Sequence, residues 1–217
     1  LPDSLGQFYS AITNFLGFDM LEGDEWKVMG LAAYGEPEYL EFFRKNILST
    51  NVKVGFTLNL DFLDHQLAKQ RIFQRKFEEV CGPQRHPGDS ISQRHMNIAA
   101  SAQKALEDVV LNLARHLHDV TKEKNLCLAG GVAFNSVING RLVRELPFTR
   151  TFIQPAAGDA GCALGAACYI YHTLLQKPRR QRMDHAYWGP SFTNQQCAEA
   201  LNARGMSYKT LTDEELP

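Results

Sequence analysis

Apolar residues recur at intervals of three and four over residues 90–124, the longest periodic stretch of the chain. The residues that share this face are Ala99, Ala102, Leu106, Val109, Val110, Leu113, Leu117 and Val120. Because an α-helix has 3.6 residues per turn, these side chains fall on one side of a helix. The pattern predicts a long helix that packs this face on a sheet. Shorter stretches with the same period predict a helix that ends near Gly17 and another over residues 38–48.

Two apolar stretches of strand length come after the long helix. Residues 125–129 end at Gly130 and Gly131, and residues 151–155 are followed by a second glycine-containing turn. A helical pattern follows each turn, the first over 132–146 and the second, rich in small residues, to about position 175. This alternation of helix, strand and turn predicts an α/β layer architecture.

Weaker patterns divide the rest of the chain. Residues 52–60 alternate between apolar and polar side chains and predict a strand, and the polar residues 61–90 predict a helical insertion over the core. Residues 176–186 are basic and polar and contain a proline, which is typical of a linker. The sequence therefore predicts one domain over 1–175 and the beginning of a second over 187–217.

The segment after the linker has its own pattern. Residues 185–190 and 207–211 predict strands, and Thr193 is placed to cap a helix over 194–203. Residues 212–216 resemble a helix cap and a first turn that is not continued, and the chain does not begin with Met. These ends lead us to expect a piece of a longer protein.

Composition and charge exclude several classes of protein. The 217 residues are 44% hydrophobic and 22% charged, with a net charge of −1, so the chain is apolar enough to bury a core but offers no strong field to a nucleic acid or a membrane surface. No apolar stretch reaches the roughly 20 residues that span a bilayer, and the first residues lack the basic start and apolar stretch of a signal peptide. We expect a soluble, cytoplasmic protein; an apolar stripe leaves the oligomeric state open.

The cysteines point to the same compartment. Their number is odd, and they are not paired at the spacing of zinc ligands; they are Cys81, Cys127, Cys162, Cys168 and Cys197. The pattern predicts reduced, buried thiols.

The turn at Gly130 and Gly131 is a candidate binding site. A strand that runs into glycines and then a helix leaves unpaired N–H groups at the helix start, where the helix dipole favours an anion. Glycines also allow adenosine or phosphate to approach the backbone, and the Asn135 amide can donate and accept hydrogen bonds. A plain strand-to-helix turn has the same pattern, and the residues alone leave both interpretations open.

The second turn adds a carboxylate. Gly158 and Asp159 follow a strand. Asp159 could ligate a metal or cap the next helix, and spacing alone favours the cap. Glu25 could bind ribose hydroxyls and Lys27 phosphate oxygens, although charged residues in a glycine-rich loop are usually solvated. His116 and His118 are a poor metal pair, because residues i and i+2 of a helix face different directions.

Three segments, in this order, carry a family resemblance. They are residues 27–35 (KVMGLAAYG), 128–135 (LAGGVAFN) and 154–161 (QPAAGDAG). Together they closely resemble the carbamoyltransferases of the nodulation-protein-U and cephalosporin-type antibiotic family, and the resemblance covers nearly the whole chain. It implies half of an actin-like ATPase domain, of the ribonuclease-H-like (ASKHA) class, followed by the start of a smaller YrdC-like α/β domain that forms carbamoyl-adenylate.

The resemblance also implies an activity and its ligands. Carbamoyl phosphate and ATP would give carbamoyl-adenylate, and the carbamoyl group would pass to a hydroxyl of a sugar or antibiotic-like acceptor. Asp159 would be one ligand of an iron ion (Fe²⁺) whose histidine ligands are not in this chain, so we expect the chain alone to be inactive. The residues expected to contact the nucleotide are Gly130, Gly131, Val132, Asn135, Gly158, Glu25 and Lys27.

Two other functions remain open at this stage. An actin-like ATP-binding module without transfer chemistry needs only the strand-turn-helix units, but it leaves residues 27–35 and 154–161 unexplained. A relative of the proteins that make threonylcarbamoyladenosine in tRNA is disfavoured by the near-neutral charge and by the extra segment that starts near Tyr187.

Overall fold

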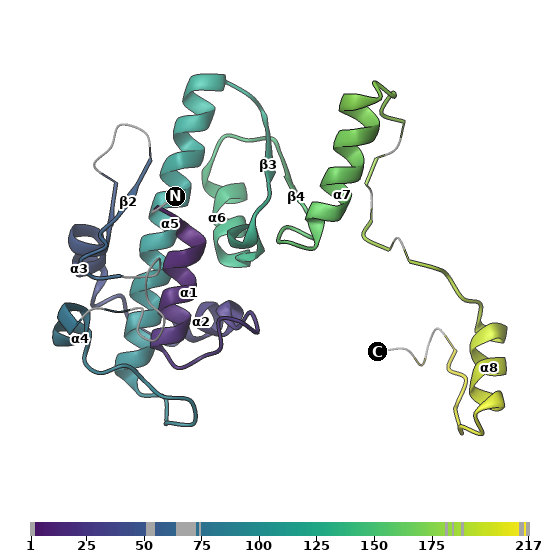
Figure 1. Cartoon of the computed structure of the whole chain (residues 1–217), viewed down its shortest axis with the longest axis horizontal. Coiled ribbons are helices and arrows are strands. Elements are labelled where there is room, and N and C mark those ends of the chain that lie inside the picture. Colours follow the sequence, from purple (N-terminus) through teal and green to yellow (C-terminus); the bar gives the residue numbers. More distant parts are fainter. Residues whose placement is uncertain are drawn as a thin grey trace.

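Helix α5 (Gln93–Thr121) runs through the middle of the packed part of the molecule (Figure 1). This computed structural model describes residues 3–50, 55–63, 73, 75–180, 182–183, 185–187, 189–212 and 215. Within them the chain is mixed α/β, mostly helical with two small sheets. The helix begins at a capping box formed by Ser92 and His95 and ends at Lys122, whose φ of 56° is left-handed.

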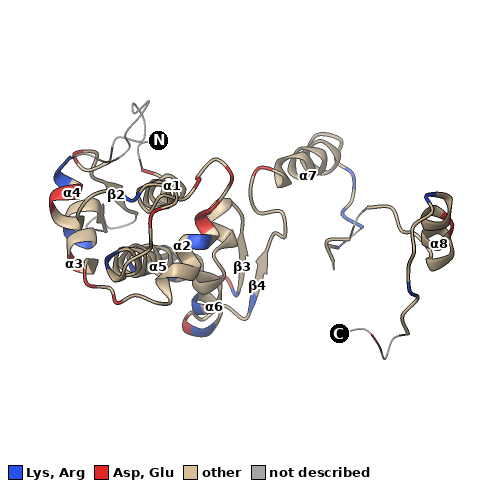
Figure 2. Cartoon of the chain, turned by 90° about the horizontal axis from the view of Figure 1, so that it is seen from below, with Lys and Arg blue, Asp and Glu red and all other residues tan. Residues whose placement is uncertain are grey.

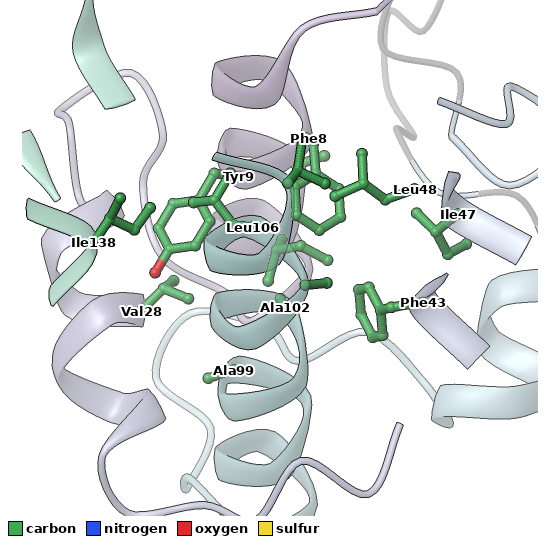
Figure 3. Packing of buried hydrophobic residues seen from close by; sticks show 14 of the residues in the cluster. Phe8, Tyr9, Val28, Phe43, Ile47, Leu48, Ala99, Ala102, Leu106 and Ile138 are labelled. Carbon is green, nitrogen blue, oxygen red and sulfur yellow. The ribbon is translucent and has the colours of Figure 1, made fainter. Parts of the chain in front are cut away.

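Helices lie on several sides of α5, so its apolar face packs mainly on helices, where a sheet was expected. Its main neighbours are the following elements: α1 (Leu5–Phe15), α2 (Glu25–Ala32), α3 (Leu40–Phe42), the π-helical turn η1 (Phe43–Ile47) and α6 (Ser136–Glu145). Ile98, Ala102 and Leu106 are buried in this contact. The small Ala102 lets α1 approach closely, with Phe8 packed beside it (Figure 3).

Aromatic rings fill the other side of α1. The Phe15 ring lies 4.8 Å from the rings of both Phe73 and Phe77, whose own centroids are 4.3 Å apart. Phe77 belongs to α4 (Arg75–Cys81), the helix described in the predicted insertion over 61–90. This segment therefore completes the core.

The second sheet confirms the predicted strand pair. Strands β3 (Asn125–Leu128) and β4 (Arg150–Ile153) are parallel and adjacent, with Leu126 opposite Thr151. The first sheet is a short antiparallel pair, β1 (Leu48–Ser49) and β2 (Thr57–Leu58). The strand predicted over 52–60 is thus shorter than expected, and its residues 52–54 lie outside the described part of the chain.

The chain after β4 packs differently. Helices α7 (Gly161–Cys168) and α8 (Asn194–Ala203) and the π-helical turn η3 (Tyr169–Leu174) have no buried residue, and Figure 1 shows α7 and α8 on the far side of β4 from α5. Thr193 caps α8 as predicted, in a capping box with Gln196. The strands predicted over 185–190 and 207–211 are wrong, because the residues described there adopt no strand.

Three further observations bear on the predictions. Only Cys81 is buried, while the other four cysteines are exposed, so the expectation of buried thiols is wrong for most of them. Both signs of charge occur on α4 and α6, whereas residues 177–182, after α7, carry four basic side chains and no acidic one, as predicted for the linker (Figure 2). Among the described residues, no helix combines the length and the apolar character needed to cross a bilayer.

Candidate functional site

A cavity of about 530 Å³ opens between α1, α2, α5 and the 3₁₀ turn η2 (Gly131–Phe134). Its lining residues are Gly6, Tyr9, Ser10, Gly23, Glu25, Trp26, Met29, Leu106, Gly131, Val132, Phe134 and Asn135. Four residues predicted from the sequence therefore meet here: Glu25, Gly131, Val132 and Asn135. The cavity is large enough for a nucleoside-sized ligand.

The backbone around Gly130 shapes one wall. Gly130 has a φ of +97°, which favours glycine, and its N–H donates to the carbonyl of Ala157 at 2.7 Å. This bond ties the first turn to the second. A methyl group at Gly158 would lie 3.1 Å from Cε2 of Phe134, so the second turn packs directly against the cavity-lining ring. Gly130 and Gly158 thus support the wall without lining it.

Asn135 is a structural residue as well as a lining one. It is buried, and its Oδ1 accepts a hydrogen bond from the backbone N–H of Ile138 at 3.1 Å, which caps α6. Its amide also pairs with that of Gln103: Nδ2 of Asn135 donates to Oε1 of Gln103 at 2.9 Å, and Nε2 of Gln103 donates back to Oδ1 at 3.2 Å. The plain-turn and binding interpretations are therefore compatible.

Tyr9 joins the same cluster from α1. Its hydroxyl donates to Oε1 of Gln103 at 2.7 Å and lies on the side of the core that contains Ile138 (Figure 3). Burial, reinforced by the negative charge of Glu107, raises the pKa of Tyr9 far above its ordinary value. The phenol therefore stays protonated at the cavity wall.

A buried ion pair lies behind this cluster. Nε2 of Gln103 also donates to Oε1 of Glu107 at 2.9 Å, and Nη1 of Arg141 donates to Oε2 of Glu107 at 2.7 Å. Arg141 is in turn held by Glu145 at 2.6 Å and 2.8 Å, and the bonds to Glu145 and then Glu107 raise the pKa of Arg141. The Glu107 side chain is only 9% exposed, and its buried charge is paired with Arg141.

Glu25 and Lys27 have different places on α2. The Ser10 hydroxyl donates to Oε1 of Glu25 at 2.5 Å, and this carboxylate lines the cavity. Lys27 does not line it: its Nζ lies 2.7 Å from Oδ1 of Asp24 and 5.5 Å from the centre of the Trp26 ring. The Lys27 ammonium, through a hydrogen bond, lowers the pKa of Asp24.

Asp159 lies outside the cavity. Its side chain is exposed and does not cap α7, whose N-cap is Ala160, so the favoured capping interpretation is wrong. No group of three His, Cys, Asp or Glu side chains that could hold a metal ion exists within the described ranges. The described residues therefore do not fit an iron site, because a transition metal needs several protein ligands.

Sequence reasoning missed several residues of the site. Trp26 and Phe134 are 64% and 55% exposed although they are large and apolar, and both line the cavity. Gln103 and Glu107 had a detectable signal, since both interrupt the apolar stripe of α5 at a spacing of one helical turn. Buried polar residues in such a stripe are hydrogen-bonded, which marks them as members of a network.

The lining determines which chemistry the cavity accepts. It contains the Glu25 carboxylate and no Lys or Arg, so it suits an uncharged group with hydrogen-bond donors better than a phosphate. The exposed rings of Trp26 and Phe134 offer flat surfaces for a planar group. The nucleoside part of a nucleotide has both properties.

Comparison with known proteins agrees with the motifs. Residues 1–168 match the family described as the N-terminus of carbamoyltransferases. Over 99% of its residues, the chain is 42% identical to the uncharacterised protein sll1178 of Synechocystis. Over 93% of its residues, it is 40% identical to the nodulation protein NolO of Bradyrhizobium diazoefficiens. The nodulation protein NolNO of Sinorhizobium fredii is 38% identical over 91%. The chain spans 36%, 34% and 27% of these three relatives, respectively.

Proposed function

The chain belongs to the carbamoyltransferase family, and on this premise we propose that its cavity binds the adenosine part of ATP and of carbamoyl-adenylate during ATP-dependent O-carbamoylation. The observation that carries the proposal is the composition of the cavity wall. It combines glycine backbone, two exposed aromatic rings and the acceptor Glu25, without a cation.

The proposed reaction has two steps in the whole protein. Water first releases inorganic phosphate from carbamoyl phosphate, and the resulting carbamate attacks the α-phosphorus of ATP with pyrophosphate as the leaving group. The product is carbamoyl-adenylate, a mixed anhydride whose carbonyl carbon is a strong electrophile. A hydroxyl of a sugar or antibiotic-like acceptor then attacks this carbon, with AMP as the leaving group and a proton released from the hydroxyl. The role of this chain is to bind and orient the nucleoside.

The residues predicted from the sequence have different roles in this proposal. The backbone at Gly131 and Val132 approaches the adenosine, and Glu25 accepts hydrogen bonds from its hydroxyls. Gly130 and Gly158 hold the two turns together, and Asn135 fixes the start of α6. Lys27, paired with Asp24, remains a proposed phosphate contact at the cavity mouth.

The arrangement of the whole protein is part of the same proposal. The parallel pair β3–β4 with its two glycine turns is consistent with half of an actin-like, ribonuclease-H-like domain over 1–175. Residues 187–217, after the linker, would begin the adenylate-forming domain. Asp159 remains the proposed contribution of this chain to an iron site whose other ligands would come from the rest of the protein.

Calorimetric titration of adenosine into the 217-residue chain tests the cavity. Trp26→Ala changes an exposed side chain, so it leaves the fold intact. Loss of one base–ring stack is expected to weaken binding by roughly five- to 150-fold, since stacking contributes roughly 1–3 kcal/mol. Tyr34→Ala, which removes an aromatic side chain that is 73% exposed and does not line the cavity, is the control.

The outcomes separate the site from the activity. Equal adenosine affinity in the native chain and in Trp26→Ala would show that the cavity is not the nucleoside site. For the whole protein, we expect AMP release that depends on both carbamoyl phosphate and an acceptor alcohol. AMP release without carbamoyl phosphate would favour an ATP-binding module of another kind.

A further inference from the structure

The hydrogen-bond polarity of the cavity wall is set by residues that do not line it. A carboxamide can face its neighbours in two orientations, with oxygen and nitrogen exchanged. At Gln103 the neighbour decides between them, because the Glu107 carboxylate only accepts hydrogen bonds. Nε2 of Gln103 therefore faces Oε1 of Glu107 at 2.9 Å, and its Oε1 faces the Tyr9 hydroxyl and Nδ2 of Asn135.

This orientation determines what Tyr9 offers a ligand. Oε1 of Gln103 accepts the proton of the Tyr9 hydroxyl at 2.7 Å. A hydroxyl has one proton, so the Tyr9 oxygen presents only lone pairs elsewhere. Tyr9 lines the cavity, so a hydrogen bond between its oxygen and a ligand is one that the oxygen accepts.

Asn135 is fixed by the same choice. Its Oδ1 accepts from Nε2 of Gln103 at 3.2 Å and from the N–H of Ile138 at 3.1 Å, which uses both lone pairs of the carbonyl. Its Nδ2 donates to Oε1 of Gln103 at 2.9 Å. An exchange of oxygen and nitrogen at Gln103 would break these bonds and place two nitrogens face to face.

An ion pair holds the cluster in this state. Arg141 donates to Oε2 of Glu107 at 2.7 Å and holds the carboxylate in place. Arg141 is itself fixed by two bonds to Glu145, at 2.6 Å and 2.8 Å. The chain of contacts thus runs from the exposed side of α6 through α5 to the cavity wall.

We propose that Gln103, oriented by Glu107 and Arg141, is a positioning residue that makes the cavity wall an acceptor surface and so selects ligands by their hydrogen-bond donors. Together with the Glu25 carboxylate, the Tyr9 oxygen then pairs with amino and hydroxyl groups, which adenosine carries. The inference rests on the proposed nucleoside function of the same cavity and specifies how the nucleoside is chosen.

The test compares adenosine with two analogues that each lack one donor group. Inosine has a carbonyl where adenosine has the 6-amino group, and 3′-deoxyadenosine lacks one hydroxyl. We expect the native chain to bind at least one analogue roughly tenfold more weakly than adenosine, the equivalent of one hydrogen bond. Because Glu25 is proposed to accept from the hydroxyls, the 6-amino group is left to the Tyr9 oxygen. Gln103→Met has nearly the same length and frees the Tyr9 proton, so discrimination against inosine should fall below about threefold, while discrimination against 3′-deoxyadenosine should remain.

The control makes the same change elsewhere on α5. Gln93 donates to the carbonyl of Tyr34 and to Oδ1 of Asn97, at the end of the helix away from Gln103. Gln93→Met should keep the native discrimination. Thermal unfolding of both variants shows whether they are folded under the titration conditions.

Three outcomes would overturn the inference in different ways. A folded Gln103→Met variant that binds all three nucleosides more weakly by the same factor, or discriminates like the native chain, removes the positioning role and leaves the cavity as the site. If the native chain binds no adenosine, the proposed function fails and this inference fails with it. If Gln103→Met does not fold, Glu107→Gln is tested instead. This variant keeps the shape of the side chain at position 107 and lets the Gln103 amide exchange its oxygen and nitrogen. Unchanged discrimination between the nucleosides in Glu107→Gln would overturn the inference.

Discussion

Helices α5 and α7 are both rich in apolar residues, but only α5 is buried. Ile98 of α5 is fully buried, whereas Leu164 of α7 is 44% exposed and the whole of α7 contains no buried residue. The difference lies in the neighbours: helices on several sides cover α5, while α7 follows β4 with little around it in the described part of the chain. An apolar sequence therefore predicts burial only where a second surface is available.

The cysteines give the largest expected contrast between the two regions. Cys81 is buried, which raises the pKa of its thiol to about 12, while Cys162, Cys168 and Cys197 are exposed. Because reagents attack the thiolate of an accessible thiol, Cys81 should react at least roughly a thousandfold more slowly, only after local opening. Labelling with a thiol reagent, followed by mass spectrometry of the peptides, measures each rate; equal rates would mean that the two regions are equally open.

A matched pair of truncations compares the two helices directly. Ile98→Ala removes a buried side chain of α5 and should lower the free energy of unfolding by about 2–5 kcal/mol. Leu164→Ala on α7 should change it by less than about 0.5 kcal/mol, since the Leu164 side chain is largely exposed. Denaturant unfolding measures both, and a loss at Leu164 as large as at Ile98 would contradict the contrast.

The same contrast explains which sequence predictions succeeded. The strand pair β3–β4 and the cap at Thr193 were predictable because each depends on a few neighbouring residues. The absence of strands near the C-terminal end was not, because β-propensity needs a partner strand to take effect.

Part of the site could be predicted in the same way. Gly131 and Asn135 were found because a strand, a glycine turn and a helix follow one another in the sequence. The Tyr9–Gln103 bond was not found, because these residues are far apart in the chain and meet only after α1 packs on α5. Trp26 gave no signal, since an exposed aromatic residue in a sequence looks the same as a core one.

A smaller effect is expected in α8. The Thr193 hydroxyl accepts a hydrogen bond from the backbone N–H of Gln196, and Thr193→Ala should cost this helix about 1 kcal/mol. Because α8 has no buried residue, the loss should stay local. Hydrogen exchange should become faster in α8 and remain unchanged in α5; a lower global stability would show that α8 is coupled to the packed region.

The smallest effect is a dependence on pH at the start of α5. Burial, with the nearby Arg94, lowers the pKa of His95 below its ordinary value of 6.5. The folded protein then binds fewer protons than the unfolded chain below about pH 6.5, so stability decreases as the pH falls through that range. Denaturant unfolding at pH 7.5 and 5.5 measures this loss of stability. The free energy of unfolding should decrease less in His95→Gln than in the native chain, and His86→Gln, at an exposed histidine, is the control. Identical decreases in all three proteins would exclude His95 as the cause.

Asn135 belongs to two structures at once, the start of α6 and the amide cluster at the cavity. For the evolution of this protein, that dual membership means epistasis. A substitution at Asn135 has to cap α6 and pair with Gln103 at the same time, so few single substitutions are tolerated at this position. We therefore expect substitutions at positions 103 and 135 to occur in pairs. In a library that randomises both positions, folded variants should contain particular pairs more often than the frequencies of the two single substitutions predict.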